Sequence, residues 1–346
     1  MSKILVTGGC GYIGSHTIVD LANNGYEVIS IDNLSRGFEQ TIGRVGMILG
    51  KKIQNYKIDL CNLDDVMAVF QEHDDIEGII HFAAYKSVPE SVNKPLEYFN
   101  NNMTSLLNVL TCAKQFEVKN IVFSSSCSVY GNADVLPVTE ATPRKEPESP
   151  YARTKQMGED ICADFVKAYP EFKVILLRYF NPVGAHESGL IGELNKVPEN
   201  LVPIVTQTAI GKRKEMTVFG NDYDTKDGSC VRDYIHVMDI AHAHTLAVQK
   251  SLSDALDSHC ELFNLGTGNG ITVLELIEAF EKVSGVKLNY NLGPRRAGDV
   301  IKVYANNEKA KTQLGWDPQY TIDQMMKTAW NWEQQLAKME ADTQKN

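Results

Sequence analysis

The stretch Gly-Gly-Cys-Gly-Tyr-Ile-Gly, residues 8–14, decides the fold. It follows an apolar run, Lys3–Thr7, that is typical of a short β-strand, and it leads into a helical pattern over Gly14–Asn24. Its glycines satisfy both a GxGxxG and a GxxGxxG spacing. Glycine is required because the backbone must turn tightly and approach a pyrophosphate, which the N–H groups of the following helix N-terminus then bind. The stretch therefore predicts a dinucleotide-binding βα unit.

A carboxylate follows at the place where such a unit binds the adenosine ribose. The next predicted strand, Glu27–Asp32, ends eighteen residues beyond Gly14, and the Asp32 carboxylate can accept hydrogen bonds from the ribose hydroxyls. Because the same carboxylate would repel a 2′-phosphate, the sequence favours NAD over NADP. Arg36 weakens this preference slightly, and a structural turn with a solvent-facing Asp32 is the alternative interpretation.

Short apolar strands alternate with helical stretches over the first half of the chain. Further strands are predicted at Gln54–Asp59, Gly78–Phe82, Asn120–Ser124 and Lys173–Arg178, and further helices at Leu63–His73, Asn101–Phe116 and Tyr151–Ala168. This alternation predicts right-handed βαβ crossovers and a parallel sheet. We therefore expect an α/β fold in which residues 1–180 form an NAD-binding, Rossmann-type doubly wound domain.

The second half has a different character. After Asn181 the predicted loops lengthen, and Gly and Pro become more frequent. Residues 181–346 are therefore expected to form mainly a smaller substrate-binding lobe. A returning segment near residues 231–266 is expected to rejoin the main sheet through the strand-like piece Glu261–Leu265. The tail from Asp317 is predicted to be a helix with a frayed polar end.

A tyrosine and a lysine follow a serine-rich strand end. The strand at Asn120 runs into several hydroxyl side chains, among them Ser126, and the stretch SPYARTK occupies residues 149–155. Its proline suits the start of a helix, so Tyr151 and Lys155 would lie one turn apart on one face. A Tyr/Lys pair is also common on ordinary exposed helices, and the pair alone does not decide between the two interpretations.

The functional interpretation concerns the Tyr151 phenol. Its reference pKa of ~10 is too high for a base at neutral pH, but a lysine ammonium and the cationic ring of NAD⁺ would favour the phenolate. Lowering the pKa by about three units requires about 4 kcal/mol. Tyr151 could then accept a hydroxyl proton while hydride passes to NAD⁺. Lys155 would hold the nicotinamide ribose, and Ser126 would bind the same substrate oxygen.

Specific motifs add a family resemblance. The set Ser126, Tyr151 and Lys155 resembles the catalytic triad of the extended short-chain dehydrogenases/reductases. Over Lys3–Trp332 the chain is more closely similar to the UDP-glucose 4-epimerases (UDP-galactose 4-epimerases). The matching segments are TGGCGYIGSHT, IHFAA, KPLEYFNNN, FSSSCSVYG, SPYARTK, LLRYFNPVGAH, FGNDYDTKDG, VRDYIHVMD, FNLGTG and PRRAGDV.

The resemblance implies an isomerase (EC 5.1.3.2) of galactose metabolism that interconverts UDP-glucose and UDP-galactose. In this family hydride leaves C4 of the sugar for NAD⁺, a 4-keto sugar rotates in the pocket, and hydride returns to its other face. One tyrosine can serve as the base in one direction and the acid in the other. The family also implies a UDP-sugar as the substrate, NAD as a permanently bound group, no metal, and a homodimer.

The resemblance and the rule that ligands bind at strand carboxyl ends together assign the binding residues. The predicted cofactor set is Gly8, Gly11, Tyr12, Ile13, Gly14, Asp32, Asn33, Asp59, Leu60, Phe82, Ala83, Ala84, Lys86, Asn101, Ser126, Tyr151, Lys155 and Phe180. The predicted substrate set is Lys86, Ser126, Tyr151, Asn181, Asn200, Leu201, Thr217, Val218, Phe219, Arg232, Arg296, Asp299 and Val303. The two arginines would neutralise the diphosphate.

Two positions depart from the family pattern. The serine strand usually continues Ser-Ala-Thr-Val-Tyr, whereas Cys127 and Ser128 stand here; we interpret Cys127 as a packing residue. Position 303 often carries a tyrosine in members restricted to non-acetylated sugars, and here it is Val303. This suggests a roomy pocket that also accepts UDP-GlcNAc and UDP-GalNAc.

The composition limits the partners and the compartment. The formal net charge is -10, which disfavours nucleic acid and anionic membranes because both attract positive surfaces. The seven cysteines are irregularly spaced without a CxxC pair, as expected for reduced thiols in the cytoplasm. No signal-peptide pattern occurs, and no apolar run approaches the ~18 residues that span a bilayer. His236, His242 and His244 are close in sequence but lack the geometry of a metal site.

Three rival functions remain open to test. A nucleotide-sugar 4,6-dehydratase shares the fold, but the related dehydratases place a carboxylate pair after the strand-end hydroxyl, where this chain has Cys127 and Ser128. A simple alcohol dehydrogenase would release NADH. A non-catalytic NAD-binding regulator could use the same fold, although an intact set of Ser126, Tyr151 and Lys155 argues against it.

Overall fold

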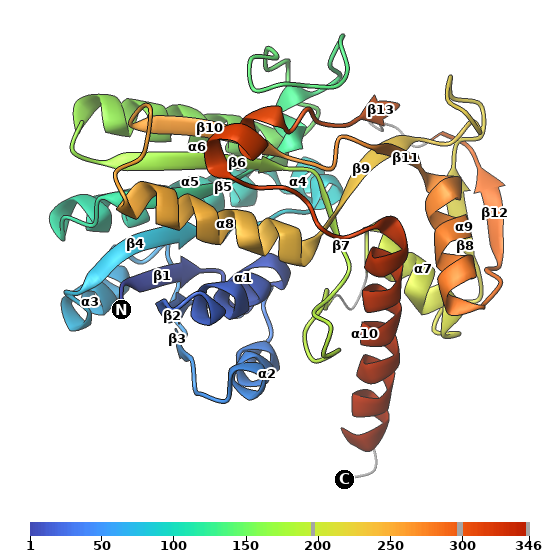
Figure 1. Ribbon diagram of the computed structural model, residues 1–346, viewed down its shortest axis with the longest axis horizontal. Coiled ribbons are helices and arrows are strands. Elements are labelled where there is room, and N and C mark those ends of the chain that lie inside the picture. The colour runs from blue at the N-terminus through green and yellow to red at the C-terminus, as the bar shows by residue number, and fades with distance from the viewer. Residues whose placement is uncertain (195–197, 296–299, 344–346) are drawn as a thin grey trace.

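A parallel sheet forms the larger half of the molecule (Figure 1). The computed structural model describes residues 1–194, 198–295 and 300–343. Within them, seven strands pair in the order β10-β6-β5-β4-β1-β2-β3, each parallel to its neighbours. This order reverses beside β1, so the predicted doubly wound α/β fold is confirmed. The strands are β1 (Lys3–Thr7), β2 (Glu27–Ile31), β3 (Gln54–Tyr56), β4 (Ile76–His81), β5 (Asn120–Ser126), β6 (Lys173–Tyr179) and β10 (Cys260–Leu265).

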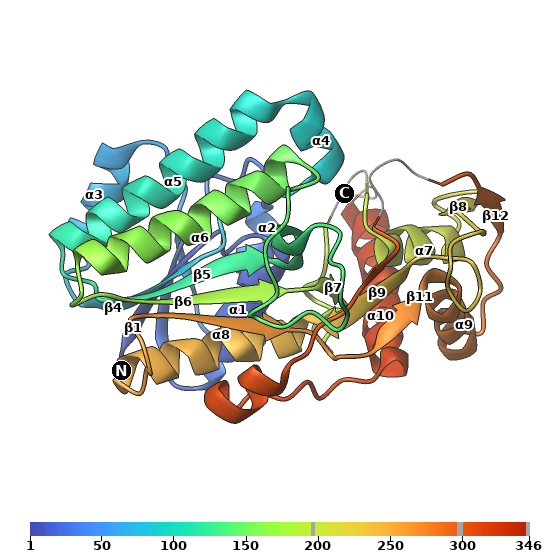
Figure 2. The same ribbon diagram turned by 90° about the horizontal axis from the view of Figure 1, so that it is seen from above.

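Helices cover both faces of this sheet (Figure 2). One face packs against α3 (Leu63–Glu72), α5 (Pro95–Gln115) and α6 (Pro150–Ala168), and the other against α1 (Tyr12–Asn23), α2 (Glu39–Leu49) and α8 (Val237–Leu252). Each helix buries an apolar stripe; Leu106 and Val109 of α5 are no more than 1% exposed, as are Ile18 of α1 and Ile240 of α8. Full burial of such a side chain stabilises the fold by about 1.5–3 kcal/mol.

The second half of the chain completes this sheet. Strand β10 pairs with β6 from Cys260↔Val174 to Leu265↔Tyr179, and α8 packs against α1 on the opposite side from α6. Both elements belong to the segment that was predicted to return near residues 231–266. The sheet that carries the glycine turn is therefore assembled from both halves of the chain.

The smaller lobe has its own sheets and its own core. One sheet has the order β11-β9-β13, with β7 also paired to β9, and a separate pair joins β8 to β12. Its core includes Val205, Leu276, Phe280 and Met326. The elements are β7 (Asn181–Val183), α7 (Leu201–Ala209), β8 (Met216–Phe219), β9 (Val231–His236), β11 (Gly270–Thr272), α9 (Val273–Ser284), β12 (Tyr290–Gly293), β13 (Lys302–Val303) and α10 (Ile322–Thr343).

Several boundaries differ from the sequence prediction. Helix α5 begins at Pro95, earlier than the predicted Asn101, because the proline occupies a first-turn position and Tyr98 buries its ring. A short helix, α4 (Val88–Asn93), precedes it. The tail helix α10 starts at Ile322, later than Asp317. The intervening backbone instead donates from Gln319 and Tyr320 to the Asp239 carboxylate, at 3.0 and 3.3 Å.

Among the residues that the structure describes, none of the helices combines the length and the apolar composition that a membrane crossing requires.

Candidate active site

The glycine turn between β1 and α1 is built by close backbone packing. A side chain at Gly14 would put its Cβ 2.2 Å from the carbonyl oxygen of Gly8, and one at Gly8 would meet the backbone nitrogen of Ala83 at 3.0 Å. Gly8 also has a φ of +75°, which favours glycine. No side chain caps the N-terminus of α1. The turn therefore presents backbone N–H groups at the place predicted for the pyrophosphate, with Ile13 in the first turn of the helix.

Asp32 lies just beyond β2 and is tied to this turn. Its carboxylate accepts hydrogen bonds from the backbone N–H groups of Cys10, at 3.0 Å, and Leu34, at 2.9 Å. The side chain is 9% exposed; burial raises its pKa and the two hydrogen bonds oppose that shift. Asn33 donates to the Asp59 carboxylate at 3.2 Å. These contacts gather the predicted ribose and adenine residues at the end of β2 and β3, with Leu60 buried after them.

Arg36 is occupied elsewhere. Its guanidinium donates to both carboxylate oxygens of Glu90 at 2.8 Å and lies 4.8 Å from the centre of the Tyr85 ring. Tyr98 donates to the same Glu90 carboxylate at 3.0 Å. An arginine held in this way by a carboxylate and an aromatic ring is less available to a 2′-phosphate. Arg36 therefore argues less strongly for NADP than its place in the sequence suggested.

The end of β4 supplies the next group of predicted cofactor residues. Phe82 stacks obliquely on His244, with ring centres 4.5 Å apart, and the Ala83 N–H donates to the Thr7 hydroxyl at 3.3 Å. Lys86 is exposed and its Nζ lies 3.2 Å from a Glu193 carboxylate oxygen. Asn101 donates to Asn102, and Ala84 lies between these groups, partly buried.

Ser126, Tyr151 and Lys155 come together between β5 and α6. Ser149 caps α6 by accepting from the Ala152 N–H at 3.2 Å, and Pro150 occupies the first turn. Tyr151 and Lys155 are then both buried, at 9% and 5% exposure. The Lys155 ammonium donates to the Ser124 carbonyl oxygen at 2.6 Å. The interpretation as an exposed surface pair is therefore wrong.

Burial dominates the electrostatics of the tyrosine. Burial raises the pKa of the Tyr151 phenol well above 10, the neighbouring Tyr179 adds to this, and a hydrogen bond with Ser126 opposes it. Burial also lowers the pKa of Lys155 to about 8, against the influence of Glu159. Its ammonium lies 6.0 Å from the centre of the Tyr151 ring. Lys155 therefore does not lower the phenol pKa by itself, and the lowering has to come with a bound cationic ring.

A buried ion pair lies one helical turn beyond Lys155, and the sequence reasoning missed it. Arg178 of β6 donates to both Glu159 carboxylate oxygens, at 2.8 and 2.6 Å, and Ser125 donates to one of them at 2.5 Å. Arg178 also lies 4.7 Å from the centre of the Tyr130 ring. A carboxylate at i+4 from a lysine was the available signal, but surface pairs give the same spacing.

A cavity of about 180 Å³ opens between the lobe sheets. Residues from β7, the start of α7, β8 and β9 line it. Those also predicted from the sequence to bind substrate are Asn181, Asn200, Leu201, Thr217, Val218, Phe219 and Arg232. The sequence reasoning missed Glu199, Val202, Met216 and Tyr234. Tyr234 reaches the cavity because it pairs with Asn181 in the ladder between β7 and β9, which no local pattern revealed. The predicted residues Arg296 and Asp299 lie outside the described residues.

Val303 and Phe180 belong to one apolar cluster. Val303 pairs with Arg232 in the ladder between β13 and β9, is 7% exposed, and packs in one apolar cluster with Val129, Tyr130 and Phe180. This cluster lies under the turn that follows Ser126. Position 303 is therefore next to the residues that follow β5.

The histidines noted in the sequence have separate structural roles. His236 caps α8 by accepting from the Met238 N–H at 3.1 Å, and His244 bonds to the Ile240 carbonyl oxygen. His242 lies near the surface, 3.3 Å from the Asp20 carboxylate. Over residues 1–194, 198–295 and 300–343, no cluster of His, Cys, Asp and Glu is suited to hold a metal ion.

Comparisons with known proteins give these features a family. Residues 5–329 match the family described as GDP-mannose 4,6 dehydratase. The UDP-glucose 4-epimerase of Pasteurella multocida is 46% identical, over 97% of this chain and 98% of its own length. The chain belongs to the UDP-glucose 4-epimerase family. Solved structures agree with this assignment. The epimerase of Stenotrophomonas maltophila, with bound NAD and formylated UDP-arabinopyranose, is 41% identical, with a TM-score of 0.94 and coverage of 98% of this chain and 100% of that one.

A second epimerase structure gives the same result. The UDP-glucose 4-epimerase from Bifidobacterium longum, in complex with NAD⁺ and UDP, is 45% identical, with a TM-score of 0.91. It covers 96% of this chain and 98% of its own. The extended short-chain dehydrogenase/reductase family predicted from the sequence motifs is therefore confirmed, within the broader group whose family description refers to a dehydratase.

The contacts of Arg36 generate a prediction about cofactor choice. Asp32→Asn should weaken NADP exclusion only modestly, because Glu90 still holds Arg36. Adding Glu90→Gln removes the carboxylate that holds the guanidinium, so the double variant should bind NADP about tenfold more tightly than Asp32→Asn, as one released charged contact of about 1.4 kcal/mol implies. Dissociation constants for NAD and NADP, measured with refolded cofactor-free protein, test this.

The matched control is Asp32→Asn with Glu97→Gln. Glu97 is an exposed carboxylate nearby that contacts Lys94, and its loss should leave NADP affinity unchanged. Equal NADP affinity in the two double variants would show that Arg36 is not withheld by Glu90.

Proposed function

We propose that this chain interconverts UDP-glucose and UDP-galactose by reversible oxidation at C4 of the sugar. The observation that carries the proposal is the burial of Tyr151 and Lys155 on one face of α6, beside Ser126 at the end of β5. Asn181 and the substrate cavity follow β6, the strand next to β5. The buried Tyr151 and Lys155 thus lie near the carboxyl ends of β5 and β6, where ligands of this fold bind, and the cavity begins at Asn181, just beyond β6.

The glycine turn and Asp32 fit NAD. The turn would hold the pyrophosphate, since a Cβ at Gly8 or Gly14 would fill its cradle, and Asp32 would accept from the ribose hydroxyls. NAD, when bound, supplies a hydride acceptor that can also return the hydride to the sugar. Lys155 would bind the nicotinamide ribose from the position that its bond to the Ser124 carbonyl fixes.

The first half-reaction begins at the sugar O4. Ser126 donates to O4 and positions it, and the Tyr151 phenolate accepts the O4 proton as the C4 hydride leaves. A 4-keto sugar results. The buried setting of Tyr151 disfavours a lone phenolate, so the base forms only where a positive ring balances it. Proton acceptance is thereby coupled to the presence of the oxidised cofactor.

The second half-reaction uses the same groups in reverse. After the sugar turns over, Tyr151 donates its proton to O4 as hydride returns to the other face of C4. The uridine diphosphate stays bound meanwhile, with Asn200, Leu201 and Phe219 bordering the uridine and Arg232 neutralising the diphosphate. Arg296 and Asp299 are proposed for the same end of the substrate on family resemblance alone.

The dehydratase alternative has less support. Elimination of water after oxidation requires a further acid and base. After Ser126 the chain has Cys127 and Ser128, and burial raises the pKa of the Cys127 thiol to about 12. A thiol that stays protonated cannot replace a carboxylate base.

Tyr151→Phe tests the proposed chemistry. The change removes the proton carrier and keeps the ring, so turnover of UDP-galactose in a coupled assay should fall at least about 10²-fold, the lower end of what general acid–base catalysis contributes. The variant should retain NAD, identified after denaturation of the protein. Turnover at the wild-type rate would indicate a scaffold, and stoichiometric NADH release by the wild type would indicate a dehydrogenase.

The pKa of Lys155 predicts the alkaline limit of activity. Because Lys155 loses its charge above about pH 8, kcat/KM should fall as the pH rises through that value. Glu159→Gln removes a negative charge that favours the ammonium, so the fall should begin at lower pH. The midpoint of the profile is the readout, since it does not depend on how much protein is folded.

Asp160→Asn is the control for this effect. Asp160 is the next residue on α6, exposed, and bound to Arg144, so its neutralisation should leave the midpoint in place. An unchanged midpoint in Glu159→Gln would show that Glu159 does not influence the pKa of Lys155.

We also propose activity on UDP-GlcNAc and UDP-GalNAc, supported by the small side chain of Val303 beside the end of β5. Val303→Tyr should abolish turnover of the acetylated sugars and leave turnover of UDP-galactose within about threefold, because added volume excludes only the larger substituent. Coupled assays with both galactose forms measure this. Wild-type protein that does not turn over UDP-GlcNAc would exclude the wider specificity.

Three further proposals concern the domain roles, the oligomeric state and the location of the protein. Residues 1–180 with the returning segment near 231–266 would serve NAD, and residues 181–346 would mainly serve the UDP-sugar. A homodimer through α5 and α6 is supported by their neighbouring positions (Figure 2) and by exposed apolar side chains, Leu107 and Met157. A cytoplasmic location is supported by the cysteines, since all seven are free thiols.

A further inference from the structure

Two hydrogen bonds join the cofactor helix to the strand that carries Asn181. The Tyr12 hydroxyl, in the first turn of α1, donates to the Gly184 carbonyl oxygen at 2.5 Å. The His186 backbone N–H donates to His16 Nε2 at 3.1 Å. Residues 184–186 directly follow β7, which carries Asn181. Two contacts between residues at least 170 positions apart thus link the helix after the glycine turn to the segment after β7.

The bond at His16 requires one form of the imidazole. His16 Nδ1 lies 2.7 Å from the Tyr12 carbonyl oxygen, which can only accept, so Nδ1 carries the proton and Nε2 is left to accept from His186. Burial lowers the pKa of this fully buried ring to about 3. The neutral tautomer is therefore the form present at physiological pH. The same His186 N–H is shared with the Ile191 carbonyl oxygen at 3.2 Å.

The far side of residues 184–186 is held by the smaller lobe. A Cβ at Gly184 would lie 2.5 Å from a carbon of the His236 ring, and Thr328 of α10 bonds both to His236, at 2.9 Å, and to the Ala185 N–H, at 3.2 Å. The ring of Tyr320 stacks on His236 at 3.8 Å. The segment is therefore fixed to the smaller lobe. In the part of the chain that the structure describes, its hydrogen bonds to α1 come from Tyr12 and His16.

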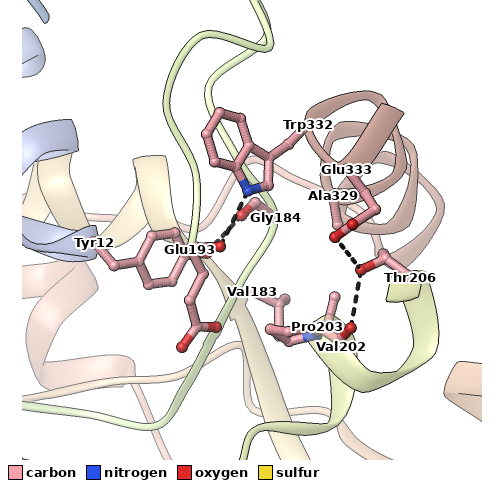
Figure 3. A pocket seen from close by; sticks show the side chains of 10 residues that line it. All are labelled: Tyr12, Val183, Gly184, Glu193, Val202, Pro203, Thr206, Ala329, Trp332 and Glu333. Atoms are coloured by element: carbon pink, nitrogen blue, oxygen red, sulfur yellow. Dashed lines mark hydrogen bonds between the residues drawn. The ribbon is translucent and has the colours of Figure 1, made fainter. Parts of the chain in front are cut away.

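The residues around these two hydrogen bonds enclose only a small cavity. Figure 3 shows Tyr12, Val183 and Gly184 lining a cavity of about 20 Å³ together with Trp332 and Glu333 of α10. Such a volume holds about one water molecule. The indole of Trp332 donates to the Glu193 carbonyl oxygen at 3.1 Å, which closes the wall. Relative movement of the lobes at this point must break the two bonds, because the packing offers no alternative position.

We propose that Tyr12 and His16 are positioning residues that latch the smaller lobe to the cofactor helix while the oxidised sugar is bound. The role rests on the proposed epimerase function. In that cycle the 4-keto sugar has to stay until it is re-reduced. If the lobes part first, UDP-4-ketohexose leaves, the hydride remains on the nicotinamide as NADH, and the O4 proton remains on Tyr151. Each such escape inactivates one enzyme molecule.

His16→Asn is the sharpest test. Its amide can keep the local bond to the Tyr12 carbonyl but is too short to accept from His186. The ratio of completed epimerisations to escapes should fall about tenfold, equivalent to about 1.4 kcal/mol. Product formation is followed by a coupled assay, enzyme-bound NADH by absorbance, and released 4-keto sugar in the ultrafiltrate. Tyr12→Phe, which removes only the hydroxyl bond, should lower the ratio in the same direction.

Matched variants separate a latch from a loss of stability. His16→Gln has an amide oxygen near the place of Nε2 and should restore the ratio to within about threefold, because the cross-lobe acceptor returns. Thr17→Val alters the next buried side chain of α1, whose hydroxyl bonds only within the helix, to Ile13, and should leave the ratio unchanged. Both variants are compared with His16→Asn at equal NAD content.

The outcomes are distinguishable. A wild-type ratio in both His16→Asn and Tyr12→Phe overturns the latch, as does an equal fall in Thr17→Val, which would indicate general loosening of α1. Failure of the wild-type protein to convert UDP-galactose overturns the proposed function itself.

Discussion

The bond from the Lys155 ammonium to the Ser124 carbonyl oxygen is the contact on which the candidate active site depends. It fastens the first turns of α6 to the carboxyl end of β5, and this brings Tyr151 to Ser126. A buried ammonium is costly without such a partner. Around it, Glu159 and Arg178 form an ion pair with both members nearly inaccessible to solvent. The apolar core sets the separation of helix and sheet, whereas these polar contacts set the depth at which the tyrosine lies.

Burial gives the site its chemical character. The phenol of Tyr151 is held as a weak acid by its surroundings, so it is a poor base until a positive charge arrives beside it. A phenolate that forms only next to the oxidised cofactor is protected against unproductive proton transfer. The proposed reaction at both faces of one carbon needs space for a sugar ring to turn, and this is the reason for proposing the cavity of about 180 Å³ as the substrate site.

Local patterns predicted a large part of this molecule. The glycine turn, Asp32 and the pair Tyr151 and Lys155 occupy short stretches whose spacing follows directly from helix and strand geometry, so the sequence was sufficient to predict their positions. The bond of Arg36 to Glu90 and the pairing of β7 with β9 join residues distant in sequence, and single-sequence patterns carry no register for them. The burial that raises the pKa of Tyr151 is a property of the folded surroundings. The residues next to Tyr151 in the sequence therefore did not reveal it. The early start of α5 was missed although Pro95 suits a first helical turn, because the burial of Tyr98 that supports this boundary is not visible in the sequence.

The place of β10 at the end of the main sheet has a consequence for synthesis. Strand β6 ends at Tyr179, yet its outer edge is covered only by Cys260–Leu265. While the chain emerges from the ribosome, the backbone groups at that edge are unpaired. The neighbouring apolar surface is also uncovered until α8 has been made. Exposed strand edges and apolar surfaces of this kind favour aggregation. The nascent protein therefore cannot close its cofactor domain until about three quarters of its length has been made, and it should depend on chaperones during this interval more than a domain whose strands are contiguous.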